Sequence, residues 1–152
     1  MDVKYLMRFG HGERGSALAM LPAFALVIIM ALGFVVDGAS SFMAQRALVS
    51  QVSAIASDAA ELAMDSGYFY RTGEHRIDGA VATAEVRRRV AELHPANVEN
   101  IDLRGVRIDG TSVVIDLEAD ARLIFAPAMP FLDSTTHISV NVRSTAELDD
   151  LE

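Results

Sequence analysis

The sequence predicts an α+β fold in which one long N-terminal helix begins in a membrane and continues into a small head. The head is expected to contain one further helix and a three- to four-stranded antiparallel sheet. Residues 16–36 contain no charged side chain, and residues 37–65 carry apolar residues at helical spacing. The final third of the chain alternates apolar and polar residues, which is the period of a half-buried strand.

The apolar run 16–36 is long enough to cross a bilayer. At about 1.5 Å per residue a helix of this length spans about 30 Å, the thickness of the hydrocarbon core. A secretory signal normally has an apolar region of only about 7–15 residues before a small-residue cleavage site, whereas this run leads directly into Asp37. An uncleaved signal anchor is therefore favoured over its two alternatives, a cleaved signal and a buried soluble helix. Pro22 lies inside the run, where a neighbouring helix or a local kink can accommodate it.

Charge predicts the orientation of this span and excludes one class of partner. Lys4, Arg8 and Arg14 precede the run, and only Arg46 follows within twenty residues, so the N-terminus is expected in the cytoplasm. Residues 37–152 carry ten arginines against nineteen acidic residues. An acidic exported domain does not bind nucleic acid by releasing counterions, so we expect no nucleic-acid partner.

Residues 37–65 are expected to extend the membrane helix as an amphipathic helix. The residues of its apolar stripe are predicted to pack against the head or against a partner. Near the head we expect the stripe to form core, and near the membrane we expect it to form an interface. The candidate packing residues are Phe42, Val49, Val52, Ala56, Ala59 and Ala63.

Residues 66–79 are expected to form a loop because they mix glycines with polar residues, and their aromatic cluster 68–70 either packs or binds. Residues 80–93 then place apolar side chains on one helical face. The three arginines 87–89 either hold an anionic partner or form a solvated face paired with Glu85 and Glu92.

Strands are predicted from the period-two pattern of residues 113–125 and 138–143. In residues 101–108 the apolar parity changes at Arg104–Gly105, as a β-bulge requires, and Asp109–Gly110 supplies a hairpin turn. The connection 126–134 contains two prolines, which exclude a ladder. It is a possible docking loop, whose apolar residues either fold back onto the sheet or dock on another protein: Met129, Phe131 and Leu132.

Residues for catalysis or metal binding do not converge in any familiar pattern. The four histidines are widely separated and match no zinc-binding spacing, and the chain has no cysteine. The G-x-G-x-x-G at residues 10–15 precedes a membrane span instead of opening a βαβ unit. We therefore expect a non-enzymatic protein without a cofactor or metal.

Five short motifs in order resemble the N-terminal and C-terminal regions of Tad/Flp pilus-assembly proteins of the TadE/TadG type. They are E-R-G at 13–15 before the span, V-D-G at 36–38, Q-R-A-L at 45–48, D-A-A-E-L-A at 58–63, and the strand–loop–strand of residues 121–146. The resemblance covers about half of the chain. It implies a pilin-like fold, a single pass through a bacterial inner membrane, and a C-terminal domain in the periplasm or outside the cell.

The same resemblance implies a function. The chain would be a minor pilin or pseudopilin-like component of a pilus assembly or secretion machine, and other subunits would contact its N-terminal helix within the bilayer. Prepilin peptidases read a glutamate five residues after the cleaved glycine, but Met20 stands there after Gly15. We therefore expect no cleavage at Gly15. The alternative function is a membrane-tethered periplasmic domain that binds or senses a ligand.

Overall fold

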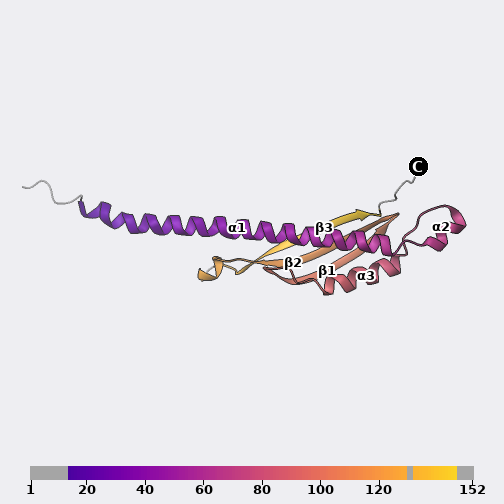
Figure 1. Ribbon diagram of the computed structural model, residues 1–152. Coiled ribbons are helices and arrows are strands. Elements are labelled where there is room, and N and C mark those ends of the chain that lie inside the picture. Colours follow the sequence, from indigo (N-terminus) through magenta and orange to yellow (C-terminus); the bar gives the residue numbers. More distant parts are fainter. Residues whose placement is uncertain (1–13, 130–131, 147–152) are drawn as a thin grey trace, which may run out of the picture.

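The computed structural model describes residues 14–129 and 132–146, with side chains from residue 20 onward. It confirms the predicted α+β class. One helix, α1 (Arg14–Leu62), contains 49 residues and continues through Pro22. At about 1.5 Å per residue it is a rod of about 70 Å. Its C-terminal half lies along the sheet, whereas its N-terminal half projects away from the rest of the molecule (Figure 1).

Two shorter helices follow α1. The segment that the sequence predicted as a loop contains α2 (Ser66–Thr72), because Asp65 caps its first turn by accepting the N–H of Tyr68 and Gly73 ends it in the left-handed region with φ of 75°. The second helix, α3 (Gly79–Ala91), overlaps the range 80–93 expected for it, beginning one residue earlier and ending two residues earlier. Asp78 caps α3 by accepting the N–H groups of Ala80 and Val81.

Three antiparallel strands form a sheet in the order β1 (Val98–Asp109), β2 (Ser112–Arg122) and β3 (Thr135–Thr145). The predicted bulge is confirmed, since the register of β1 against β2 shifts between Leu103 and Gly105. A second shift, between Glu99 and Asp102, was not predicted. β1 and β2 are joined by a tight turn in which Gly110 has φ of 61°.

The hydrophobic core lies between one face of the sheet and the two helices α1 and α3. Rows of apolar residues cross the strands on this face; for example, Leu103, Leu117 and Val140 are paired across β1, β2 and β3. Four alanines on the covering face of α1 allow the helix to lie close to the sheet: Ala44, Ala56, Ala59 and Ala60. Larger Leu48, Val52 and Ile55 on the same face fill the core, and Ala63 follows directly after the helix. The helix that contains the apolar segment thus also forms part of the core of the head.

The opposite face of the sheet is polar and carries cross-strand charge pairs. Arg104 contacts Glu118 at 2.6 Å, and Arg143 contacts Asp109 at 2.6 Å. Val114 is the exception on this face, and it is buried opposite Arg107 and Arg143. Exposed pairs of this kind add little to stability, and their placement identifies the solvated side of the head.

Candidate functional site: the junction of the long helix and the head

A single carboxylate of α1 holds the end of the head that faces the apolar half of the helix. Asp37 is only 5% exposed. Its Oδ1 accepts the backbone N–H groups of Ile124 at 2.7 Å and Phe125 at 2.8 Å, and its Oδ2 accepts that of Ala126 at 2.9 Å. We call residues 123–129 the junction loop. The loop connects β2 to the segment before β3, and Asp37 ties it to α1 across 87 residues of sequence.

The three donors also determine the charge state of Asp37. Desolvation by burial alone would raise the pKa of this carboxyl, but the N–H groups of Phe125, Ile124 and Ala126 together hold the pKa below its ordinary value of 3.8. Asp37 is therefore ionised at neutral pH. A buried carboxylate whose lone pairs are filled by backbone donors is a stable structural clasp.

The junction loop has a second contact one helical turn before Asp37. Gly33 is buried, and a Cβ built on it would lie 3.4 Å from Cβ of Phe125 and 3.5 Å from its Cγ. Gly33 and Asp37 are four residues apart and therefore lie on the same side of α1. The small glycine lets the Phe125 ring approach the helix backbone, so the loop is fixed to the rod at two successive turns.

Local sequence explains why the strand stops at this point. β2 ends at Arg122, and the next turn is a short 3-10 helix, η1 (Ala126–Ala128), with Pro127 in its first turn. Proline has no N–H to donate to a ladder. The free N–H groups at the start of η1 face Asp37, which is the arrangement that favours an anion.

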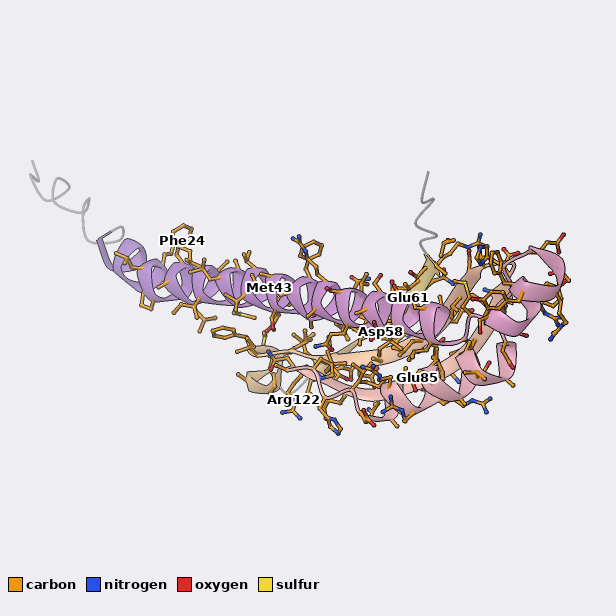
Figure 2. The ribbon with its side chains drawn as sticks, turned by 45° about the vertical axis from the view of Figure 1, so that its right-hand side comes forward. Phe24, Met43, Asp58, Glu61, Glu85 and Arg122 are labelled. Atoms are coloured by element: carbon orange, nitrogen blue, oxygen red, sulfur yellow. The ribbon has the colours of Figure 1, made fainter. Side chains whose placement is uncertain are left out.

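The N-terminal half of α1 exposes large apolar side chains on every side. Within the described residues, one helix is long and apolar enough to cross a membrane, and only 11% of its most apolar window is buried. Exposed fractions there run from 40% to 69% for Met20, Leu21, Phe24, Leu26, Val27, Ile28, Ile29, Leu32, Phe34, Val35 and Val36. Figure 2 shows Phe24 on the part of α1 that projects away from the head.

The predicted packing stripe divides along the helix. Val52, Ala56, Ala59 and Ala63 are buried in the head's own core. Phe42 is 64% exposed and Val49 is 38% exposed, and neither belongs to that core. Met43, which the stripe did not include, is exposed by 69% beside Phe42. The structure thus brings four of the six residues together in the core and leaves the two nearest the apolar segment outside it.

The predicted docking loop is described only in part. Met129 and Leu132 are half-buried, and the N–H of Leu132 donates to the carbonyl of Met129 at 3.1 Å. Phe131 lies outside the described residues. Just before this connection, Ile124 is 56% and Phe125 is 42% exposed. The sequence predicted a strand over 113–125, but β2 ends at Arg122, and both residues lie in the loop that follows.

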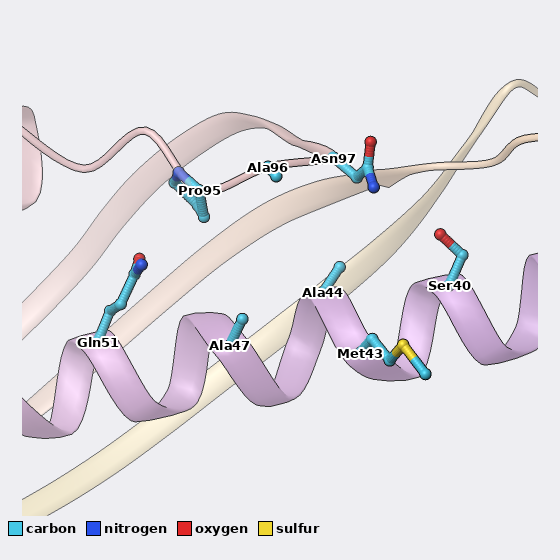
Figure 3. A pocket seen from close by; sticks show the side chains of 8 residues that line it. All are labelled: Ser40, Met43, Ala44, Ala47, Gln51, Pro95, Ala96 and Asn97. Atoms are coloured by element: carbon cyan, nitrogen blue, oxygen red, sulfur yellow. The ribbon is translucent and has the colours of Figure 1, made fainter.

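A pocket of about 400 Å³ lies between α1 and the segment that connects α3 to β1. Small residues of α1 and three polar side chains line it: Ser40, Met43, Ala44, Ala47, Gln51, Pro95, Ala96 and Asn97. In Figure 3 the side chains of Ser40, Ala44 and Gln51 point from the helix toward the segment Pro95–Asn97. The volume suits a small molecule, although none of the lining residues is charged.

The aromatic cluster and the arginine run have structural partners. Phe69 stacks on His75 with ring centroids 4.4 Å apart, and Tyr70 is 86% exposed at the end of the head far from the apolar segment (Figure 1). Arg88 pairs with Glu85 at 2.5 Å, and Arg89 reaches both Glu85 at 2.9 Å and Asp58 of α1 at 3.3 Å. The paired, solvated interpretation of this helix face agrees with these contacts.

Local sequence patterns do not indicate the junction loop's contacts with α1. Asp37 ends the apolar run and belongs to the V-D-G motif at 36–38, but neither feature predicts that its carboxylate binds this loop. Among the described residues no group of three or more potential ligands could hold a metal ion. Comparison with known protein families, with curated proteins and with solved structures gave no match.

Proposed function

We propose that this chain is a single-pass membrane protein whose head is a non-enzymatic assembly module. The N-terminal half of α1 would cross the bilayer, and the head would stand on its outer side. In its most specific form the proposal is a pilin-like component of a Tad/Flp-type pilus or secretion machine of the TadE/TadG type. The sequence motifs suggest that machine, and a bacterial inner membrane would then be its location.

One observation carries the proposal: the same helix is an exposed apolar rod in its first half and the core of a folded head in its second. A helix buried in a soluble core would cover these side chains, but here they are mostly exposed. Exposing this much apolar surface to water is unfavourable by about 25 cal/mol for each Å². In a bilayer these side chains would contact lipid and this unfavourable exposure would be removed. Because the head leaves them exposed, a buried soluble helix is the least supported of the alternatives.

The junction argues against a cleaved signal. Cleavage directly after Val36 would remove Gly33 and make Asp37 the first residue of the remaining helix, and cleavage beyond Asp37 would remove both. The N–H groups of Ile124, Phe125 and Ala126 would then lose their acceptor. Leaving buried donors unpaired costs about 1–3 kcal/mol each. These contacts support an apolar helix that stays attached to the head.

An assembly role is supported by the exposed apolar residues just beyond the span. Phe42, Met43 and Val49 are large apolar residues in the stretch of α1 just beyond the apolar segment, and they are 64%, 69% and 38% exposed. In a bundle of such subunits the rods would pack here, next to the bilayer. The small residues of the span, including Ala23, Ala25 and Ala31, would allow close helix approach within it.

The proposal is tested by photo-cross-linking in native membranes. A benzoylphenylalanine placed at Phe42 or Val49 is expected to yield adducts with other subunits after membrane extraction. The same probe at Glu61, which is exposed near the far end of α1, is the matched control and is expected to yield fewer. Equal adduct yields at all three positions would contradict a role for this surface in assembly.

The second candidate function is a membrane-tethered ligand-binding domain, and the pocket beside Pro95–Asn97 is the observation that favours it. Ala47→Trp would fill part of this pocket, because Ala47 lines it and is exposed. An assembly component is expected to keep its cross-linked partners in this variant. If Ala47→Trp keeps its cross-linked partners but no longer supports the assembly or secretion that the wild-type chain supports in cells, the ligand-binding role is favoured instead.

A further inference from the structure

The junction loop lies beside the last turns of the apolar segment. Its Phe125 side chain contacts Gly33, which is three residues inside the end of the run at Val36. Three residues of helix correspond to about 4.5 Å along the axis. In the membrane setting proposed above, the Phe125 side chain therefore reaches the outer end of the apolar run, while the loop backbone is held at the level of Asp37. Figure 1 shows the loop at the end of the head that faces the N-terminal half of α1.

The side chains that the loop presents at this level are apolar. Ile124 is 56% exposed and Phe125 is 42% exposed, although both are large and hydrophobic. The sequence from Leu123 to Leu132 contains no charged residue, whereas Arg122 and Asp133 on either side are charged and exposed. An uncharged apolar tip with charged flanks is the pattern of a segment that enters the headgroup region of a bilayer.

The backbone of the loop is also prepared for an environment without water. The N–H of Leu123 donates to the carbonyl of Ser134, and Asp37 accepts the next three. Pro127 has no N–H. Those of Ala128 and Met129 donate to the carbonyls of Phe125 and Ala126, each at 2.9 Å. Every N–H of residues 123–129 therefore has an acceptor, as a lipid-facing backbone requires because unpaired groups there are costly.

From these observations we propose that the junction loop is a second membrane contact. Ile124 and Phe125 insert into the outer headgroup and acyl boundary next to the span, and Asp37 keeps the loop folded there. The occupant of this apolar surface is thus phospholipid, because Phe125 lies against Gly33 inside the apolar segment of α1, and the large apolar side chains on the other sides of that segment are exposed. This inference rests on the proposed membrane span. It adds that the head sits against the bilayer and does not stand clear of it.

The chain contains no tryptophan, so a single introduced tryptophan reports on one position. The full-length protein is reconstituted in phosphatidylcholine and phosphatidylglycerol vesicles, with and without lipids brominated high in their acyl chains, which quench tryptophan by contact. Ile124→Trp reports on the loop and Val35→Trp on the span. Tyr70→Trp is the control at the distant end of the head, where the native side chain is 86% exposed.

Interfacial side chains lie about 5–10 Å into the boundary, so brominated lipid is expected to lower the emission of Ile124→Trp and Val35→Trp by roughly twofold or more. The emission of Tyr70→Trp is expected to stay unchanged. Quenching of Val35→Trp without quenching of Ile124→Trp would overturn the loop contact while leaving the span intact. A blue-shifted but unquenched Ile124→Trp would assign the surface to a protein and overturn the lipid contact. An unquenched Val35→Trp would overturn the span and this inference together.

Discussion

Replacing Asp37 with asparagine removes the negative charge shared by three backbone N–H groups while preserving the size of the side chain. In the wild-type protein Oδ1 accepts two of these groups and Oδ2 accepts the third. The Oδ1 of asparagine can keep the bonds to Ile124 and Phe125. Its amide group is itself a donor, however, and meets the N–H of Ala126 without forming a bond.

The magnitude follows from these three contacts. Hydrogen bonds to a charged group contribute about 1.5–3 kcal/mol each, neutral ones about 0.5–1.5 kcal/mol, and an unpaired buried donor costs about 1–3 kcal/mol. Two weakened bonds and one lost bond together give a destabilisation of about 3 kcal/mol. Since about 1.4 kcal/mol is a factor of ten in an equilibrium constant, Asp37→Asn is expected to raise the open population of the junction loop by about 100-fold.

Amide hydrogen exchange of the full-length protein in detergent micelles measures this opening directly. The amides of residues 124–126 are expected to exchange about 100-fold faster in Asp37→Asn, while those of Ile115 and Leu117 in β2 keep their protection. Asp58→Asn is the matched control, because Asp58 is a partly exposed carboxylate of the same helix. The free energy of opening is expected to change by no more than about 0.5 kcal/mol in this variant. Unchanged exchange at 124–126 would refute the clasp, and equal acceleration throughout β2 would refute its local character.

Three further expectations concern the core, the charged helix and the orientation. Ala56 is fully buried, so Ala56→Glu is expected to destabilise the head by about 3–5 kcal/mol in denaturant titrations, whereas exposed Gln51→Glu stays within about 0.5 kcal/mol; equal midpoints would contradict the core assignment. Hydrogen bonds, first from Arg88, lower the pKa of Glu85 to about 2, so its stabilising contribution is complete above about pH 4.5 and is lost as the pH falls toward 2. NMR titration of the carboxyl checks this, and an apparent pKa near 4.5 would refute it. Alkaline phosphatase fused at the C-terminal end is expected to be active, and intact mass is expected to show no chain cleaved after Gly15; an inactive but stable fusion or a cleaved chain would contradict the orientation or the processing, respectively.

Much of the fold was predictable because it depends on the period of the apolar residues. The long helix and the strands each have their own spacing of apolar residues, and that spacing can be read directly from the sequence. The bulge near Arg104 shifts the strand spacing by one residue, which is also visible in the sequence. The second irregularity of β1 surrounds Asn100, where φ is 52°, and a single asparagine leaves no such periodic signal. Helix α2 was missed because its glycine and aromatic residues resemble a loop, although its caps, Asp65 and Gly73, are visible in the sequence.

The candidate site was harder to predict because it is made by contacts that no local pattern encodes. The partners of Asp37 are backbone groups, and any residue except proline supplies the same N–H. Gly33 likewise looks like any small residue of an apolar helix in the sequence, and only the structure shows that Phe125 lies against it. By contrast, the burial of Val52 and Ala56 follows from the helical spacing of the stripe.

The continuity of α1 has a mechanical consequence in the proposed membrane setting. No flexible linker separates the span from the head, so the head follows any tilt of the helix. The 26 residues of α1 that follow Val36, residues 37–62, extend about 39 Å at about 1.5 Å each. A tilt of about 20°, common for single spans, would move the far end sideways by about 13 Å. Bilayer thickness influences this tilt, so the reach of the exposed tip at Tyr70 toward its neighbours would vary with the lipid in which the helix sits.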